Sequence, residues 1–325
     1  MSAEYDAFLL VSFGGPEKHE DVIPFLENVL RGRNVPPERM LEVAEHYYHF
    51  DGRSPINDQC RNLIAALEDE LHLPIYWGNR NWHPMLADTV AKMRDDGVRR
   101  ALALATSAFG SYSGCRQYRE DIERARAVVE NAPEIDKMPP FWDHPGFIET
   151  IALRVREALQ KLPGAAIVYT AHSIPVAMAH SSPYERQLRS VCAIVNEQLG
   201  LGNPVLAFQS RSGPPSQPWL EPDIGDYIRG TDAKKLIVVP VGFLSDHMEV
   251  LYDLDTEAAA LAAERGIEFV RAGTAGTHPR FIGAIREMVH TAMEYGPRSI
   301  CEPDCCQRSA APAEAARRGG PGTAA

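Results

Sequence analysis

The sequence predicts a doubly wound α/β fold, and three observations support this prediction. Short, continuous apolar runs alternate with longer amphipathic helical patterns, which is typical of parallel strands covered by helices on both faces. The 325 residues are enough for one large or two medium domains. Hydrophobic residues make up 45% of the chain and charged residues 24%, which are ordinary values for a globular protein with a packed core.

Apolar runs with strand character occur along the whole chain. The predicted strands are 7–13, 74–78, 100–106, 165–171, 204–210, 235–241 and 267–273. Amphipathic helices are predicted between them, for example over 57–72 and 145–162. A Pro-rich joint at 137–147 divides the strands between two sheets.

The predicted organisation has two α/β domains and a tail. We expect an N-terminal domain over 3–138, a C-terminal domain over 139–300, and a tail over 301–325. The tail begins with a cysteine motif. It continues with Ala, Gly, Pro and charged residues and no large apolar residue, a composition typical of disorder.

Charge and hydropathy exclude several classes of protein. The net charge of −11 argues against a nucleic-acid binder. No apolar run reaches transmembrane length, and the first residues lack a basic secretory n-region, so we expect a cytoplasmic protein. The glycine-containing segment 273–277 lacks the Lys-Ser/Thr of a phosphate-binding loop, so we expect a turn there and no nucleotide.

Candidate chemical groups follow two strands of the C-terminal half, where ligands bind in open α/β sheets. His172 ends the run 165–171 and could bind metal, accept a proton, or serve only a structural role. Glu249, Asp253 and Glu257 follow the run 235–241 at spacings of four residues, which places them on one face of a helix.

Helix capping is the alternative explanation for the first of these acids. Asp246 and Glu249 form an Asp-x-x-Glu pattern that suits a helix start. Capping does not explain Asp253 and Glu257, which border the apolar stripe of the helix. An acidic column beside buried surface suits a divalent cation.

A basic loop in the N-terminal half offers a second candidate site. Arg31 and Arg33 lie in the predicted loop 24–40, in the same half as Ser54 and Tyr118. Loop arginines are usually only solvated, but these could form a rim that binds carboxylates.

The six cysteines fall into two groups. Cys60 and Cys192 lie in helical patterns and are expected in the core. The other four are Cys115, in a polar loop, and Cys301, Cys305 and Cys306, within six residues. This density in a reducing compartment indicates a soft-metal or iron–sulfur site, with a zinc site or plain thiols as the alternatives.

Five motifs in order resemble the ferrochelatase family over residues 5 to 295: LLVSFGGP, HFDGRSPIN, YTAHSIP, FQSRSGPP…WLEP and VGFLSDHMEVLYDLD. The resemblance implies two Rossmann-like domains with the active-site cleft between them. It also implies a lyase that inserts Fe²⁺, as a substrate, into a porphyrin during haem biosynthesis.

The resemblance also assigns roles to the metal-site candidates. It implies that His172 is the metal-site histidine, that Glu249 is its partner, and that Asp253 and Glu257 form an acidic line leading outward. Phe13 takes a position on the opposite face of the macrocycle. Some relatives have Tyr there, and Phe offers no oxygen to a metal.

For the porphyrin, the resemblance implies that Ser54 and Tyr118 contact propionates. The polar, Arg-bearing loop with Arg31 and Arg33 favours coproporphyrin III, which has four propionates, over protoporphyrin IX, which has two. Two other readings stay open: a non-catalytic tetrapyrrole or metal carrier, and cobalt chelation on the corrin pathway.

Some ferrochelatases hold a 2Fe–2S cluster with one internal cysteine and three near the C-terminus. Cys115, Cys301, Cys305 and Cys306 match that layout, which implies a cluster here. Neighbouring haem-pathway enzymes are the expected transient partners.

Overall fold

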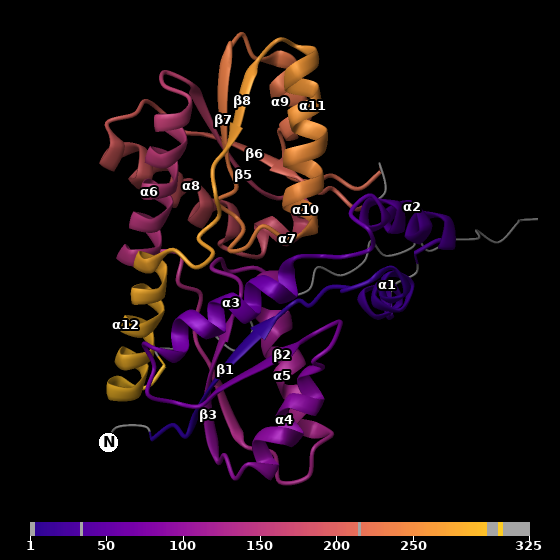
Figure 1. The fold of residues 1–325 in the computed structure, drawn as a ribbon, viewed down its shortest axis with the longest axis vertical. Coiled ribbons are helices and arrows are strands. Elements are labelled where there is room, and N and C mark those ends of the chain that lie inside the picture. The colour runs from indigo at the N-terminus through magenta and orange to yellow at the C-terminus, as the bar shows by residue number, and fades with distance from the viewer. Residues whose placement is uncertain (1–3, 33–34, 214–215, 298–304, 308–325) are drawn as a thin grey trace, which may run out of the picture.

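The computed structural model describes residues 4–32, 35–213, 216–297 and 305–307. It contains two four-stranded parallel sheets flanked by helices, one in each half of the molecule (Figure 1). The strand orders are β2-β1-β3-β4 and β6-β5-β7-β8. Two Rossmann-like α/β halves, as predicted from the sequence, are therefore confirmed.

Each predicted strand is present, with ends that differ by one or two residues. The first sheet contains β1 (Ala7–Ser12), β2 (Ile75–Asn79), β3 (Arg100–Ala105) and β4 (Glu134–Lys137). The second contains β5 (Ala166–His172), β6 (Val205–Gln209), β7 (Lys235–Val239) and β8 (Glu268–Arg271). Strand β4 was not predicted, because this edge strand has one apolar residue, Ile135, among three charged ones.

The N-terminal half is covered by a 3₁₀ turn, five α-helices and one π-helix. They are η1 (His19–Asp21), α1 (Val22–Leu30), α2 (Pro37–Tyr48), α3 (Ile56–Glu68), α4 (Leu86–Asp95), the π-helix η2 (Tyr112–Arg116) and α5 (Gln117–Ala127). The predicted loop 24–40 is wrong, since most of it lies in α1 and α2, which sit together on one side of the molecule (Figure 1). Apolar residues hidden in this polar composition, such as Phe25, Leu26 and Ala44, form their own small core.

The C-terminal half contains α6 (Pro145–Lys161), α7 (Val176–His180), α8 (Tyr184–Leu199), α9 (Ile224–Gly230), α10 (Met248–Val250), the π-helix η3 (Leu251–Ala258), α11 (Ala259–Glu264) and α12 (Pro279–Tyr295). Helix α12 packs against α6 and also against α3 of the other half. In the described part of the chain, no helix is both long and apolar enough to cross a membrane.

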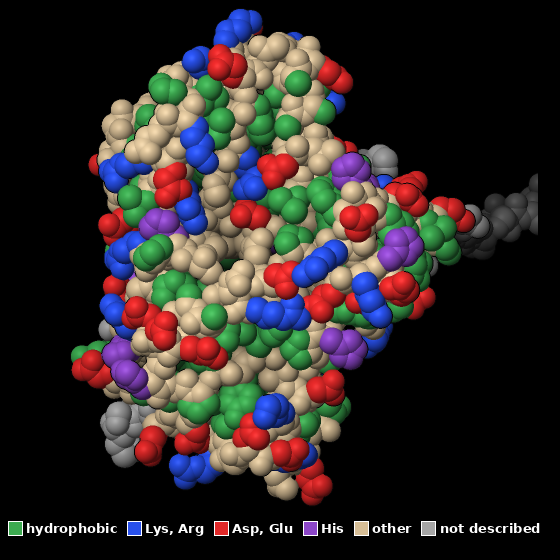
Figure 2. Space-filling view, viewed as in Figure 1, with side chains coloured by type: hydrophobic (Ala, Val, Ile, Leu, Met, Phe, Trp, Pro, Cys, Tyr) green, Lys and Arg blue, Asp and Glu red, His purple; other side chains and the backbone are tan. Residues whose placement is uncertain are grey.

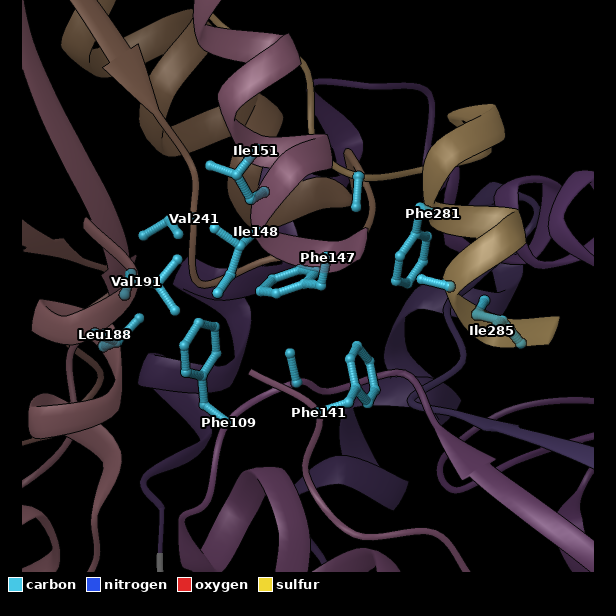
Figure 3. Packing of buried hydrophobic residues seen from close by; sticks show 14 of the residues in the cluster. Phe109, Phe141, Phe147, Ile148, Ile151, Leu188, Val191, Val241, Phe281 and Ile285 are labelled. Carbon is cyan, nitrogen blue, oxygen red and sulfur yellow. The ribbon is translucent and has the colours of Figure 1, made fainter. Parts of the chain in front are cut away.

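One apolar cluster joins the two halves. Phe109 and Phe141 follow strands of the first sheet, and their rings meet Phe147 of α6 (Figure 3). Phe281 of α12 packs against the same ring, with centroids 6.1 Å apart. Because this core is continuous, it fixes the strand ends of one half relative to those of the other.

The proposed domain boundary at 138/139 lies between the sheets. The last strand of the first sheet ends at Lys137, and the first strand of the second begins at Ala166. We propose that the segment from 139 onward belongs to the C-terminal domain. The predicted tail lies outside the described residues except for 305–307.

Candidate active site

The candidate site begins at the carboxyl end of the central strand β5. His172 is the last residue of β5 and pairs in register with Gln209, the last residue of β6. The neighbouring strand β7 leads through residues 240–247 into α10, which carries Glu249. The parallel sheet therefore brings the imidazole and the first carboxylate to the same edge, as strand-end reasoning predicts.

His172 and Glu249 face one another without direct contact. The distance from His172 Nε2 to Glu249 Oε2 is 3.9 Å. His172 Nδ1 lies 2.5 Å from the carbonyl oxygen of Ser173. A carbonyl only accepts, so Nδ1 carries the proton, and Nε2 of the neutral ring keeps its lone pair. The pair thus presents two electron donors with room for a proton or a metal ion between them.

The acidic column is carried by a π-helix instead of the regular helix expected from the sequence. Glu249 lies in α10, while Asp253 and Glu257 lie in the π-helix η3. The wider i→i+5 turns still leave residues four apart on nearly one face. π-Helical turns are rare and occur often at functional sites.

Among the acids of the column, Asp253 has the pKa that is shifted furthest from its ordinary value. Burial, assisted by Glu249 and Glu257, raises its pKa to about 7, against the hydrogen bond from Ser210 Oγ and the charge of His172, which lower it. Ser210 has φ +63°, an uncommon left-handed conformation for a residue other than glycine, and it directs its hydroxyl to Asp253. The Asp253 carboxyl therefore changes protonation near neutral pH.

Glu257 continues the column outward. Burial raises the pKa of its carboxyl, and the nearby Asp223 carboxylate adds to this. Gln209 Nε2 lies 3.4 Å from the Glu249 carbonyl oxygen and 3.5 Å from Asp253 Oδ2, so it contacts the inner part of the column. The column is therefore coupled electrostatically along its length.

His247, which was not among the predicted site residues, caps α10. Its Nδ1 accepts a hydrogen bond of 3.2 Å from the Glu249 N–H. Burial lowers the pKa of His247, opposed by Glu249, so the neutral ring that can accept this bond is favoured. Asp246, the residue in the capping pattern, instead pairs with Arg271 at 2.7 Å. The place of His247 directly before the acidic helix was the available signal.

Phe13 lies at the end of β1, beside the small core of α1 and α2. Its ring meets Phe25 edge-on at 6.2 Å. The guanidinium of Arg80 lies 5.6 Å from the Phe13 ring and 4.5 Å from the Tyr118 ring, and it pairs with Asp121. Arg80 was also missed, although it follows β2 at the same sheet edge.

Besides Phe13, four residues were predicted to contact the substrate, and three of them, Arg31, Ser54 and Tyr118, lie in the described part of the chain. Arg31 is exposed just after α1 and bonds Asn28, and Arg33 lies outside the described residues. Ser54 is buried, and its Oγ accepts a 3.4 Å hydrogen bond from the Ile56 N–H at the start of α3. Tyr118 is buried on α5 under Arg80.

Two of the cysteines predicted to hold a cluster, Cys115 and Cys305, have contacts at the π-helix η2, which follows β3. Cys115 is buried in the π-helix η2, not in the polar loop expected, and Lys137 Nζ donates to its Sγ at 3.3 Å. Arg116 Nη1 donates to the Cys305 carbonyl at 2.9 Å. Cys306 is buried, and Cys301 lies outside the described residues. Cys60 and Cys192 are buried, as predicted.

Figure 2 shows acidic and basic side chains interspersed over this face of the molecule, with no extended basic stripe. Among the described residues, no group of three His, Cys, Asp or Glu side chains forms a ready metal cage.

The fold is that of tetrapyrrole chelatases. It resembles the sirohydrochlorin chelatase SirB from Bacillus subtilis, with a TM-score of 0.58 at 12% identity, covering 90% of this chain and 97% of that one. CbiX, the terminal enzyme of siroheme biosynthesis in denitrifying bacteria, gives a TM-score of 0.53 at 16% identity over 88% and 99% of the two chains.

Sequence comparison shows which family of chelatases the chain belongs to. The ferrochelatase family profile matches residues 5–293. A ferrochelatase from Rhodopirellula baltica is 54% identical, covering 93% of both chains. Coproporphyrin III ferrochelatases from Nocardia farcinica and Frankia alni are 48% and 50% identical, covering 96% and 93% of this chain and 99% and 86% of theirs. This chain belongs to the ferrochelatase family.

Proposed function

We propose that this chain inserts Fe²⁺ into coproporphyrin III, with release of two protons, in haem biosynthesis. The observation that carries the proposal is the His172–Glu249 pair, 3.9 Å apart, at the head of an acidic column. Membership of the ferrochelatase family supports metal insertion. The names of the relatives from Nocardia farcinica and Frankia alni support coproporphyrin III as the porphyrin.

The first step is exposure of the porphyrin nitrogens. A flat porphyrin points its nitrogen lone pairs into its own plane, where an incoming metal ion reaches them poorly. Binding energy from the ring edge and the propionates can bend one pyrrole out of the plane. Phe13, with Arg80 against its ring, is proposed to support the face opposite His172.

His172 and Glu249 are proposed to exchange protons for iron. The lone pair on His172 Nε2 accepts a pyrrole proton, and the Glu249 carboxylate stabilises the imidazolium that forms. The same two atoms suit the incoming ion, because first-row divalent metals bind imidazole nitrogen and carboxylate oxygen at about 2.0–2.2 Å. Two pyrrole protons leave for each iron ion that enters.

Asp253 and Glu257 are proposed to connect this pair with solvent. A carboxyl group with a pKa of about 7 accepts and releases protons at nearly equal rates at neutral pH. Each proton passed outward leaves a carboxylate that attracts the next cation. One column can therefore serve proton exit and iron entry in alternation.

The four propionates of coproporphyrin III call for cations and hydrogen-bond donors around the ring. Exposed Arg31 on the projecting α1–α2 segment is proposed as one such partner, together with Arg33, Ser54 and Tyr118. Guanidinium groups bind carboxylates through two parallel hydrogen bonds. The four-propionate substrate gains more from such partners than the two-propionate protoporphyrin IX does.

A 2Fe–2S cluster is proposed for Cys115, Cys301, Cys305 and Cys306. The described cysteines fit such a group in part. Cys115 is buried with Lys137 at its sulfur, and Arg116 holds the Cys305 backbone beside η2. Cationic donors of this kind suit thiolate ligands, which carry negative charge. The cluster would give the purified protein a visible absorbance of its own.

The test is an anaerobic insertion assay with each porphyrin. We expect kcat/KM for Fe²⁺ insertion to be at least about tenfold higher with coproporphyrin III than with protoporphyrin IX. His172→Ala and Glu249→Gln should each lower kcat by roughly 100-fold or more, while the exposed control His180→Ala retains activity. Stoichiometric porphyrin binding without turnover would support a carrier instead, and wild-type rates in both variants would contradict the assigned roles.

The proposed function also concerns where the protein acts in the cell and which enzymes it contacts. We propose a cytoplasmic location and transient contact with the enzymes that supply the porphyrin and receive the haem. Transfer of a poorly soluble ring between such enzymes favours short-lived complexes. Co-fractionation of the wild-type protein with the soluble cell extract tests the location.

A further inference from the structure

A single side chain of the N-terminal half holds the backbone that leads into the metal-site helix. Gln59, on α3, donates from Nε2 to the Asp246 carbonyl oxygen at 2.9 Å. Its Oε1 accepts from the Asp246 N–H at 2.8 Å. The two residues are 187 positions apart in the sequence. The amide therefore pairs with both the N–H and the C=O of one residue, much as a residue of a neighbouring antiparallel strand would.

Asp246 is connected to both ends of the acidic segment. It lies three residues before Glu249 and next to the capping His247. Its carboxylate pairs with Arg271 of β8 at 2.7 Å, and Arg271 also pairs with Asp255 within η3 at 2.6 Å. A displacement of Asp246 therefore displaces the start of α10 and strains the attachment of η3.

The loop that contains Asp246, which Gln59 contacts, borders a cavity between the two halves. A cavity of about 170 Å³ lies between the two halves, bordered by Gln59, Leu244 and Asp246. Other cavity-lining residues come from the first sheet, from the loop after β8 and from α12, including Ser12, Thr274 and Phe281. Because packing is incomplete there, directed hydrogen bonds have more influence on the loop position. Helix α3 lies at the junction of the halves, facing α10 across it (Figure 1).

We infer that Gln59 is a positioning residue for metal insertion, which fixes the height of Glu249 above the porphyrin held by the N-terminal half. The inference rests on the proposed function, since it concerns how that site is aligned. The porphyrin supports, Phe13 and Arg80, belong to the same half as Gln59, whereas Glu249 belongs to the other. The amide is a direct polar link between these two sets of residues.

Several charged or titratable groups surround position 59 and would interact with a charge introduced there. They are Asp58, Cys60 and Arg61 on α3, Asp246 on the loop, Arg271 from β8 and Arg154 from α6. A carboxylate at this position would face the Asp246 carbonyl oxygen at the place of the present Nε2 donor. A protonated carboxyl would restore both hydrogen bonds, because it carries one donor and one acceptor.

Two variants exploit this chemistry. Gln59→Met has nearly the same size and removes both hydrogen bonds, while Gln59→Glu restores them only when protonated. We expect Gln59→Met to lower kcat/KM for Fe²⁺ by roughly 10- to 100-fold, with porphyrin affinity, measured by fluorescence titration, within about twofold of wild type. The activity of Gln59→Glu relative to wild type should rise as the pH falls from about 7 to about 4.5, where a glutamic acid side chain gains its proton, and that of Gln59→Met should stay flat.

Matched measurements separate positioning from simple loss of fold. Exposed Gln160→Met on α6 serves as the control for the amide-to-thioether change. A purely structural role would lower the melting temperature and the active fraction, and would leave the pH profile of Gln59→Glu parallel to wild type. Parallel profiles, or unchanged kcat/KM for Fe²⁺ in Gln59→Met, would overturn the inference. If the wild-type protein itself inserts no iron, the proposed function fails instead.

Discussion

The acidic column should destabilise the folded protein above neutral pH, and Asp253→Asn tests this directly. The pKa of Asp253 is about 7 in the folded protein and 3.8 ordinarily, mainly because the carboxyl is buried beside Glu249 and Glu257. At 1.36 kcal/mol for each pKa unit, this difference corresponds to a penalty of about 4 kcal/mol for holding the ionised group in the fold. Allowing half for solvent relaxation at a partly exposed site leaves about 2 kcal/mol.

The sign of the pH dependence follows from proton binding. Between pH 3.8 and about 7 the folded protein keeps a proton on Asp253 that the unfolded chain has lost. The free energy of unfolding therefore falls as pH rises through this window, and this contribution is constant above it. Asparagine cannot ionise, and its Oδ1 can still accept the hydrogen bond from Ser210. We expect Asp253→Asn to be more stable than wild type at pH 8 by about 2 kcal/mol, and equal to it near pH 4.

Urea unfolding of the metal-free protein at several pH values provides the assay. Exposed Asp226→Asn on α9 is the control, and its effect should not grow with pH in the same window. A stability difference between Asp253→Asn and wild type that is absent, or that is the same at pH 4 and pH 8, would refute the reasoning. The same variant should insert iron more slowly, because the column loses its proton-exchanging group.

Three further predictions follow from particular contacts. Phe147→Ala should lower the free energy of unfolding by about 3–5 kcal/mol in urea titrations, because its fully buried ring fills the core between the halves; a loss below about 1 kcal/mol would contradict this. Cys115→Ser should yield protein that lacks the visible absorbance and bound iron of a cluster, and unchanged spectra would remove Cys115 from the ligand set. His247→Ala should lower stability by about 1 kcal/mol through loss of the helix cap, whereas His247→Asn should restore most of it, as thermal melts can show.

Continuous apolar strands made most of this fold predictable from the sequence. The strand around Leu236 and Val238 is buried on both faces, so it appears as an uninterrupted apolar run in the sequence. Strand β4 gives no such signal, because it lies at the sheet edge and keeps Asp136 and Lys137 half-exposed. The helices α1 and α2 were hidden for a related reason, since a few apolar residues on a small separate core are enough to hold them.

The side chains of the candidate site that come directly after strands could be located from the sequence, and the others could not. His172 and Glu249 each follow an apolar run, so parallel pairing brings them together without knowledge of loop geometry. The π-helical form of η3 was not predictable, because helical spacing of apolar residues does not distinguish i→i+4 from i→i+5 hydrogen bonding. Gln59 gave no signal at all, since its role depends on a contact with Asp246, 187 positions away.

The acidic column opposes folding, and the apolar core shared by the two halves stabilises the fold against it. Burying Asp253 between Glu249 and Glu257 opposes folding at neutral pH, and proteins of this size have only about 5–15 kcal/mol of net stability. The aromatic cluster of Phe109, Phe147 and their neighbours joins both halves, and each such ring contributes several kcal/mol. A protein that only binds its ligand gains nothing from burying Asp253, with a pKa of about 7, close to two other acids. A chelatase must receive a cation and release two protons at one place, and a carboxyl group such as that of Asp253, with a pKa of about 7, suits the exchange proposed above.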